Sequence, residues 1–471
     1  MLSILQRSKI LDSNAKWWGI KTSDMMEKAG AGIAMELIRE YGKHKSYAII
    51  CGLGNNGGNG LVTARFLVEM YGVRVTVYLI GREADIKVEE SRRNFQILKQ
   101  LAKKFYFLKI KQDSFAKDIE KHDIVVECLL ETDIKGKLHK RFYDVVKKIT
   151  KLKCKKVAID FPVPGYKYDL SISLHFEKVK GSKVIDIGIP SEVEQYVGPG
   201  EIQQLYIPAP ESYKTQNGEL FVFGGSNVFH GAPLMAIMTA SKFIGSVYFY
   251  TTSENRELLK TLKSKVCEFI TVQDNEIEKY ANYADAFLIG PGLQDNLLNR
   301  SIIHTLFKLF PDKPKVIDAY AIAMAIEEDL KNCILTPHRG ELRHIWGEKV
   351  NLKTQRLEGN LRRFAKESGA IVILKGHVSI LFNRNGEVKF NKTGNAGMAK
   401  GGTGDIMAGL TGAFLTKNDP WLAAQCGIFI NGLAGDLACK EFGYNFSATD
   451  IVPFIQKAVK LAREFKSGYL N

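Results

Sequence analysis

Residues 394–409 read GNAGMAKGGTGDIMAG, and this stretch decides the fold expected for the second half of the chain. Glycines crowd around one carboxylate, Asp405, and the apolar residues Ile406, Leu410 and Phe414 then recur at helical spacing. Glycine permits positive φ and a helix N-terminus attracts anions, so we predict a phosphate-binding loop that opens a helix. We expect Asp405 to take a proton from a hydroxyl that attacks a phosphoryl group. The alternative is that Asp405 only stabilises the helix dipole.

The composition is that of an ordinary globular protein. The chain has 471 residues, 45% of them apolar and 25% charged, which predicts roughly two or three domains. The net charge of +15 comes from lysines spread along the chain, so we expect anionic small substrates and no nucleic-acid partner; a polyanion partner is the alternative. No uninterrupted apolar run reaches about 18 residues. We therefore expect no membrane span. The seven cysteines show no CxxC pair, which favours reduced thiols, and the expected location is the cytoplasm.

Two halves of the chain each alternate apolar strands with helices, a pattern typical of a doubly wound parallel sheet. A stretch rich in proline and glycine at 197–212 marks the junction, so we place the domains at 1–205 and 206–471. Residues 378–391 predict a hairpin that turns at Asn385-Gly386. The predicted strands are 47–51, 73–80, 123–130, 156–160 and 183–190 in the first half, and 219–226, 246–252, 285–292, 315–319, 333–338 and 370–376 in the second.

The loops after these strands should line one crevice, because carboxyl-end loops of an α/β sheet meet at the same edge. Five of them, read in order, are GGSNVFHGA (224–232), IGPGL (289–293), LTPHRGEL (335–342), LKG (374–376) and GNAGMAKGGTGD (394–405). This set resembles the ADP- or ATP-dependent NAD(P)H-hydrate dehydratases, which are ribokinase-like enzymes. The resemblance implies that a nucleotide drives loss of water from a hydrated nicotinamide ring. A small-molecule kinase of the same fold, such as a vitamin-precursor kinase, is the alternative.

The resemblance also implies site residues in the second half. Asp405 is implied as the catalytic base, and Mg²⁺ is expected to shield the phosphates. The hydrate is implied to contact Ala232, Gly292, His338 and Asp405, and the nucleotide to contact Lys375, Gly376, His377, Val378, Ser379 and Gly404. Two departures leave local substrate contacts open: Tyr213-Lys214-Thr215 stands where the family reads HKG, and Asp318-Ala319-Tyr320 where it often reads DAD.

The first half carries CGLGNNGGNG at 51–60, which contains the GxGxxG pattern of dinucleotide-binding turns. The strand at 73–80 has no acid at its tip to hold a ribose, so we do not favour an ordinary dehydrogenase site. Together with MEKAG (26–30) and DIGIP (186–190), the stretch 51–65 resembles NAD(P)H-hydrate epimerases, which are commonly fused to the dehydratase. The fold implied is a Rossmann-like three-layer αβα domain, followed by a ribokinase-like α/β domain.

The epimerase resemblance implies a substrate site made by Asn55, Asn56, Gly57, Gly58, Asn59 and Asp160. Asp160 is the implied catalytic acid, and Asn56 and Glu127 are the implied ligands of K⁺.

Several residues depart from the epimerase pattern. Asn59 stands where the family has aspartate, Glu131 and Asp133 replace glycines, and Val163 stands where a serine ligand is expected. These changes leave two hypotheses, an active epimerase and a retained scaffold without turnover. The family further implies a homo-oligomer, with the N-terminal helix as a candidate interface.

Overall fold

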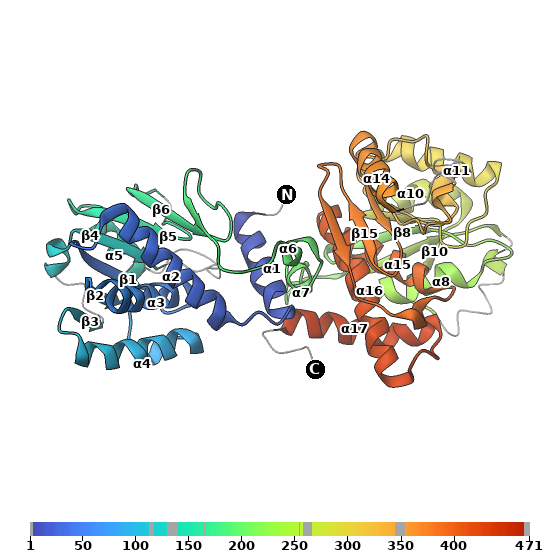
Figure 1. Ribbon diagram of the computed structural model, residues 1–471. Coiled ribbons are helices and arrows are strands. Elements are labelled where there is room, and N and C mark those ends of the chain that lie inside the picture. The colour runs from blue at the N-terminus through green and yellow to red at the C-terminus, as the bar shows by residue number, and fades with distance from the viewer. Residues whose placement is uncertain are drawn as a thin grey trace. The chain divides into compact units, whose positions relative to one another are not determined.

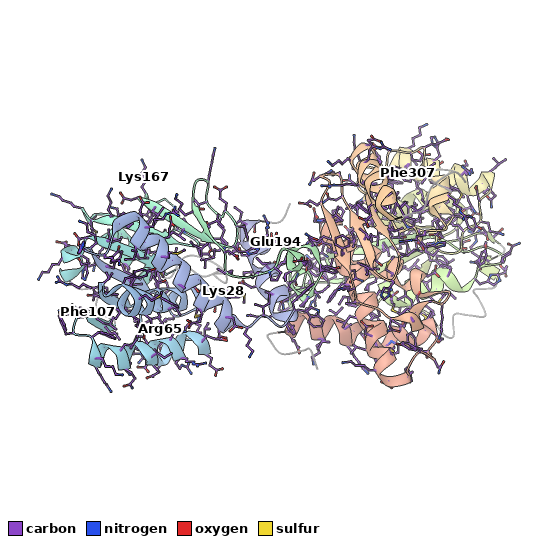
Figure 2. The ribbon with its side chains drawn as sticks, in the orientation of Figure 1. Lys28, Arg65, Phe107, Lys167, Glu194 and Phe307 are labelled. Carbon is purple, nitrogen blue, oxygen red and sulfur yellow. The ribbon has the colours of Figure 1, made fainter. Side chains whose placement is uncertain are left out.

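The computed structural model describes two compact units of the chain, each drawn with its helices and strands in Figure 1. The described residues are 3–112, 117–129, 140–163, 165–253, 255–257, 266–343 and 354–465. The division falls between Val193 and Glu194. Glu194, labelled in Figure 2, therefore opens the second unit.

The predicted boundary at residue 205 lies inside the second unit. The short helix α7 (Pro199–Ile202) is buried, and Val197 donates its N–H to the carbonyl of Phe390 at 2.9 Å. Lys389 also pairs with the carboxylate of Glu201 at 3.3 Å. The prolines and glycines at 197–212 thus lie in a segment that packs within the second unit, and they do not form a linker between units.

The first unit is built on a parallel sheet in the order β3-β2-β1-β4-β5-β6-β7, the strand order of a dinucleotide-binding fold. Four predicted strands are confirmed, the strand predicted at 183–190 ends at Ile185, and β3 and β6 were not predicted. The strands are β1 (Ser46–Cys51), β2 (Arg74–Leu79), β3 (Leu108–Gln112), β4 (Ile124–Cys128), β5 (Lys155–Ile159), β6 (Leu170–Leu174) and β7 (Lys183–Ile185).

Both faces of this sheet are covered, which explains the continuous apolar strands. In β1, Tyr47, Ile49 and Cys51 join the core under the helices α2 and α3, while Ala48 and Ile50 join the core under α5. This confirms the predicted three-layer αβα domain. The helices are α1 (Ile4–Trp17), α2 (Thr22–Tyr41), α3 (Asn55–Tyr71), α4 (Glu89–Lys104), α5 (Lys140–Ile149) and the short α6 (Ser191–Gln195).

The second unit is built on a sheet in the order β10-β9-β8-β11-β12-β13-β14-β15-β16. Strands β10 to β14 pair in parallel, and β14, β15 and β16 pair antiparallel, so the predicted hairpin is confirmed. The strands are β8 (Glu219–Phe223), β9 (Ser246–Tyr250), β10 (Ile270–Thr271), β11 (Ala286–Ile289), β12 (Lys315–Ile317), β13 (Cys333–Leu335), β14 (Ile371–Leu374), β15 (Ser379–Phe382) and β16 (Val388–Asn391).

Helices cover the two faces of the second sheet as well. One face packs on α15 and the other on α10, α11 and α12. Gly409 of α15 lies against the backbone of Ala236 in α8, so a side chain there would collide with it. The helices are α8 (Gly231–Ala240), α10 (Ile277–Tyr283), α11 (Leu297–Leu309), α12 (Ala321–Met324), α14 (Thr354–Ser368), α15 (Thr403–Leu415), α16 (Pro420–Phe442) and α17 (Ala448–Glu464).

Helix α16 is long and apolar enough to cross a membrane by length and composition. However, 83% of its most apolar window is buried inside the structure, where it contacts α15 and α17. Its composition is that of a core helix.

Candidate functional site

The predicted glycine-rich loop opens helix α15, as the sequence indicates. Gly402 precedes the helix with a φ of +100°, a left-handed conformation that favours glycine. Asp405 lies in the first turn of the helix. Its carboxylate therefore sits beside backbone N–H groups that have no partner within the helix, the place where an anion binds.

Lys375 extends from the end of β14 to the start of α15. A Cβ built on Gly404 would lie 3.4 Å from its Nζ, so the two residues implied to hold the nucleotide are neighbours. The ammonium pairs with Asp318 Oδ1 at 3.0 Å and with Glu341 Oε2 at 3.8 Å. Thr336 donates its hydroxyl to the same oxygen of Asp318 at 2.5 Å. Lys375 is thus held by two acids, neither of which is Asp405.

This arrangement determines the acidity of Asp405. Burial raises its pKa to about 7, and the carboxylate of Asp318 acts in the same direction, while the ammonium of Lys375 lowers it. For Lys375, burial lowers the pKa, but the carboxylates of Asp318 and Glu341 outweigh burial and leave it above its ordinary value. A carboxylate with a pKa near neutrality is well matched to proton abstraction, because it is ionised at pH 8 and still basic.

The other implied residues of this unit fall into two groups. His338 pairs with Lys375 as an isolated parallel bridge, and its exposed ring lies 3.3 Å from Glu341. The turn 376–379 follows, with Ser379 Oγ accepting the N–H of Gly376 at 3.3 Å. Gly292, with a φ of +74°, lies against Phe229 and Pro233, beside Ala232 at the start of α8.

In the first unit, the asparagine-rich stretch after β1 opens helix α3. Gly57 and Gly58 have no room for side chains, because a Cβ would collide with the carbonyl of Gly52 or with the side chains of Ser91 and Met26. These two glycines position the start of α3 and lie outside the cavity that the helix borders. Asn55, Asn56 and Asn59 do line that cavity.

The cavity encloses about 80 Å³ and brings Asp160 together with these asparagines. Asp160 directly follows β5 and has a φ of +66°, an uncommon conformation for a residue with a side chain. Its Oδ1 accepts the N–H of Leu174 at 3.0 Å and pairs with the ammonium of Lys178. His175, which also lines the cavity, has a φ of +69°. Backbone strain of this kind clusters at functional sites.

The implied K⁺ ligands are both buried, although only Asn56 reaches the cavity. Asn56 donates its Nδ2 to the carbonyl of Ile159 at 2.9 Å, and its Oδ1 has no hydrogen-bond partner among the described residues. Glu127 accepts the N–H of Leu129 at 2.7 Å and the hydroxyl of Tyr168 at 3.1 Å, outside the cavity lining. An unpartnered amide oxygen fits a hard cation such as K⁺.

The departures from the epimerase pattern have different structural consequences. Val163, in place of the expected serine, is 3% exposed and packs in the core under α5, so it supplies no ligand. Asn59 keeps its place on the cavity but as a neutral side chain. Glu131 and Asp133 lie outside the described residues.

Comparison with known proteins identifies both units. Residues 220–457 match the family model described as NAD(P)H-hydrate dehydratase, and residues 22–190 match the model described as YjeF-related protein N-terminus. The chain is 33% identical to the bifunctional NAD(P)H-hydrate repair enzyme Nnr of Methanocaldococcus jannaschii, over 96% of this chain and 92% of that protein. The chain belongs to the family of bifunctional NAD(P)H-hydrate repair enzymes.

Two further likenesses support this membership. The repair enzyme Nnr of Archaeoglobus fulgidus is 30% identical over 97% of this chain and 98% of that protein. A ribokinase-like superfamily protein of Enterococcus faecalis V583 matches 57% of this repair enzyme and 96% of its own chain, with 25% identity and a TM-score of 0.51. The second likeness confirms the ribokinase-like fold of the second unit.

Sequence reasoning left three neighbours of the two sites without a role. Glu341 stands in the quoted stretch LTPHRGEL, and Asp318 was named only as part of Asp318-Ala319-Tyr320, where the family often reads DAD. Lys178 belongs to the segment after β6, a strand that was not predicted at all. A lysine a few residues beyond the alternating stretch LSISL (170–174) was the available signal.

Proposed function

We propose that the second unit uses ADP or ATP to dehydrate the 6S hydrate of NADH or NADPH. Asp405 takes the proton of the hydroxyl on C6, and the oxygen attacks the terminal phosphoryl group, so that the nucleotide leaves one phosphate shorter. Loss of the phosphate from C6 and of a proton from C5 then forms the C5–C6 double bond of the reduced nicotinamide ring. The observation that carries this proposal is the position of Asp405 in the first turn of α15 with a pKa of about 7.

The neighbouring residues fit binding roles for the two substrates. Lys375 and the N–H groups around Gly404 are placed to hold nucleotide phosphates, with Gly376, His377, Val378 and Ser379 along the same nucleotide. The hydrate then contacts Ala232, Gly292 and His338.

Mg²⁺ is expected to enter on the nucleotide. The part of the chain that the structure describes contains no cluster of three or more His, Cys, Asp or Glu placed to hold a metal. This fits an ion carried mainly by substrate phosphates, whose charge it shields.

The test is to incubate the enzyme with hydrated NADH and ADP or ATP. We expect recovery of the absorbance band of reduced nicotinamide, with release of one phosphate for each molecule recovered. A stable phosphorylated product without recovery would instead identify a small-molecule kinase.

For the first unit we propose epimerisation of the R and S hydrates at C6, with Asp160 as a catalytic residue. The cavity beside Asn55, Asn56 and Asn59 and the strained backbone of Asp160 support this role. K⁺ would be held by the free oxygen of Asn56, with Glu127 as the nearby acid, and would supply positive charge to a substrate bearing phosphates. If the wild-type enzyme fails to speed consumption of the pure R hydrate, the unit is a scaffold.

We expect the enzyme to act on these small molecules in the cytoplasm as a homo-oligomer. All seven cysteines are free thiols, which suits a reducing compartment. Exposed apolar side chains at Ile4, Trp18 and Met35 make the N-terminal helices the candidate interface. Sedimentation of the full chain tests the assembly.

A further inference from the structure

A buried lysine of the first unit forms an ion pair with Asp160, the proposed catalytic carboxylate. The ammonium of Lys178 pairs with Asp160 Oδ1, and their side chains are only 6% and 12% exposed. Both residues line the cavity. A buried charge pair of this kind is costly to desolvate and is weak evidence for stability, so its position at a cavity marks it as a candidate for a functional role.

The surroundings of Lys178 hold its ammonium at the cavity wall. Its Nζ lies 5.0 Å from the ring centroid of Phe161 and 5.2 Å from that of Phe176, distances at which aromatic faces stabilise a cation. The hydroxyl of Ser173 accepts the N–H of Lys178 at 3.1 Å. The strained residue His175 lies in the same turn after β6. The chain thus fixes a proton donor and a proton acceptor on two neighbouring strand ends.

We propose that Lys178 is the acid that works with Asp160 in the epimerisation, a proposal that rests on the epimerase function proposed above. The two groups can play opposite roles in proton transfer, because the carboxylate can only accept a proton and the ammonium can only donate one. Ring opening at a carbon that carries both a hydroxyl and a ring nitrogen is assisted by a base that takes the hydroxyl proton and by an acid that gives the nitrogen a proton.

The step proceeds by opening and closing of the hydrated ring. Asp160 takes the proton of the C6 hydroxyl, and the electron pair of that O–H bond forms the second C–O bond of an aldehyde. The C6–N1 bond breaks, its electron pair stays on N1, and Lys178 gives N1 a proton. After rotation about C5–C6, the neutral amine of Lys178 recovers the N1 proton and N1 attacks the other face of C6. Protonated Asp160 then returns its proton to the oxygen, so atoms and electrons balance without an oxidant.

Lys178→Met and Lys178→Arg test this role in the full-length enzyme, with Lys180→Met as the matched control. Lys180 is an exposed lysine of the same turn and lies outside the cavity lining. Conversion of the pure R hydrate to the S hydrate is followed by chromatography without nucleotide, and the background rate is subtracted. We expect Lys178→Met to lower kcat by about 10²-fold or more and the control to keep the wild-type rate.

The arginine variant separates proton transfer from charge. Arginine keeps the positive charge but does not give up a proton at neutral pH, so Lys178→Arg should remain as slow as Lys178→Met. Ethylamine added to Lys178→Met should restore turnover in proportion to its concentration. Near-wild-type turnover by the arginine variant, or no response to the amine, would show that Lys178 only places Asp160.

Two further readouts keep the outcomes distinct. Dehydration of the pure S hydrate by Lys178→Met should equal that of the wild type, which shows that the second unit is intact, while recovery of epimerisation with ethylamine shows that the first unit is folded. Epimerisation in D₂O should leave C5 unlabelled, and deuterium at C5 would overturn the ring-opening step. If the wild type itself fails to speed epimerisation, the proposed epimerase function is wrong. If the wild type is active and Lys178→Met is equally fast, the epimerase function stands and only the role of Lys178 is wrong.

Discussion

The two units place a carboxylate near a lysine at the edge of a parallel sheet, but they join the two groups differently. In the first unit, Lys178 forms an ion pair with the proposed catalytic carboxylate, Asp160. In the second unit, Lys375 is held by Asp318 and Glu341, and Asp405 keeps a raised pKa of about 7. On the roles proposed above, the partner of the lysine distinguishes an acid that forms one half of an acid–base pair from an acid that acts as a base alone.

The largest effect should come from Asp405→Asn, which removes the only base proposed in the second unit. We expect dehydration to fall about 10³-fold, because general-base catalysis contributes about 10²–10⁴-fold. Nucleotide binding, measured by calorimetry, should survive, and epimerisation of the R hydrate should not change. The matched control is Asp312→Asn, an exposed carboxylate of the same unit. Dehydration within a few-fold of the wild type would remove the contrast between the units.

A smaller effect, confined to the first unit, is expected from Asn56→Ala. The variant deletes the buried amide oxygen proposed to bind K⁺, so epimerisation should fall about 10- to 100-fold. Its rate should also become the same in K⁺ and in Na⁺ buffers, whereas the wild type should be faster in K⁺. A variant that is still activated by K⁺ would place the ion elsewhere.

The pH dependence of dehydration tests the role of Asp405 as a base, and the expected change in kcat/KM is about tenfold. Asp405 must be ionised to take a proton, so kcat/KM should rise from pH 6 to pH 8 with an inflection near 7. The charge of Asp318 raises the pKa of Asp405, so Asp318→Asn should move the inflection to lower pH. An inflection that stays in place would mean that Asp318 does not act on the base.

The smallest effect concerns stability. Burial raises the pKa of Asp405 in the folded state above its unfolded value of about 3.9, so ionisation favours unfolding. Stability from this group is complete below pH 4 and is lost as the pH rises through 7. The side chain of Asp405→Asn stays neutral, so at pH 8 the free energy of unfolding of the variant, measured with urea, should exceed that of the wild type. We expect a difference on the order of 1 kcal/mol, because the site is partly solvated. The difference should shrink towards pH 5, and an equal gain at both values would point to another cause.

Much of the fold could be predicted because its signals are local. Ten of the predicted strands coincide with observed strands, and GGTGD opens a helix at the expected place. The strands β3, β6 and β10 were missed, because LKIKQ (108–112) and LSISL (170–174) alternate polar with apolar residues and Ile270–Thr271 is only two residues long. The compact units divide between Val193 and Glu194, ahead of the predicted boundary at 205, because proline and glycine mark turns whether or not the turn then packs on a neighbour.

By itself, the sequence determined the two α/β units, their family and the two acids, since these follow from residues close together along the chain. Only the tertiary structure decided which lysine each acid faces. Lys178 meets Asp160 across two strand ends, 18 residues away, and Lys375 meets Asp318 from 57 residues away. Such pairings depend on strand order and on which side chains lose contact with water. Burial and a distant charge, rather than the sequence around Asp405, set the pKa of its carboxyl near 7.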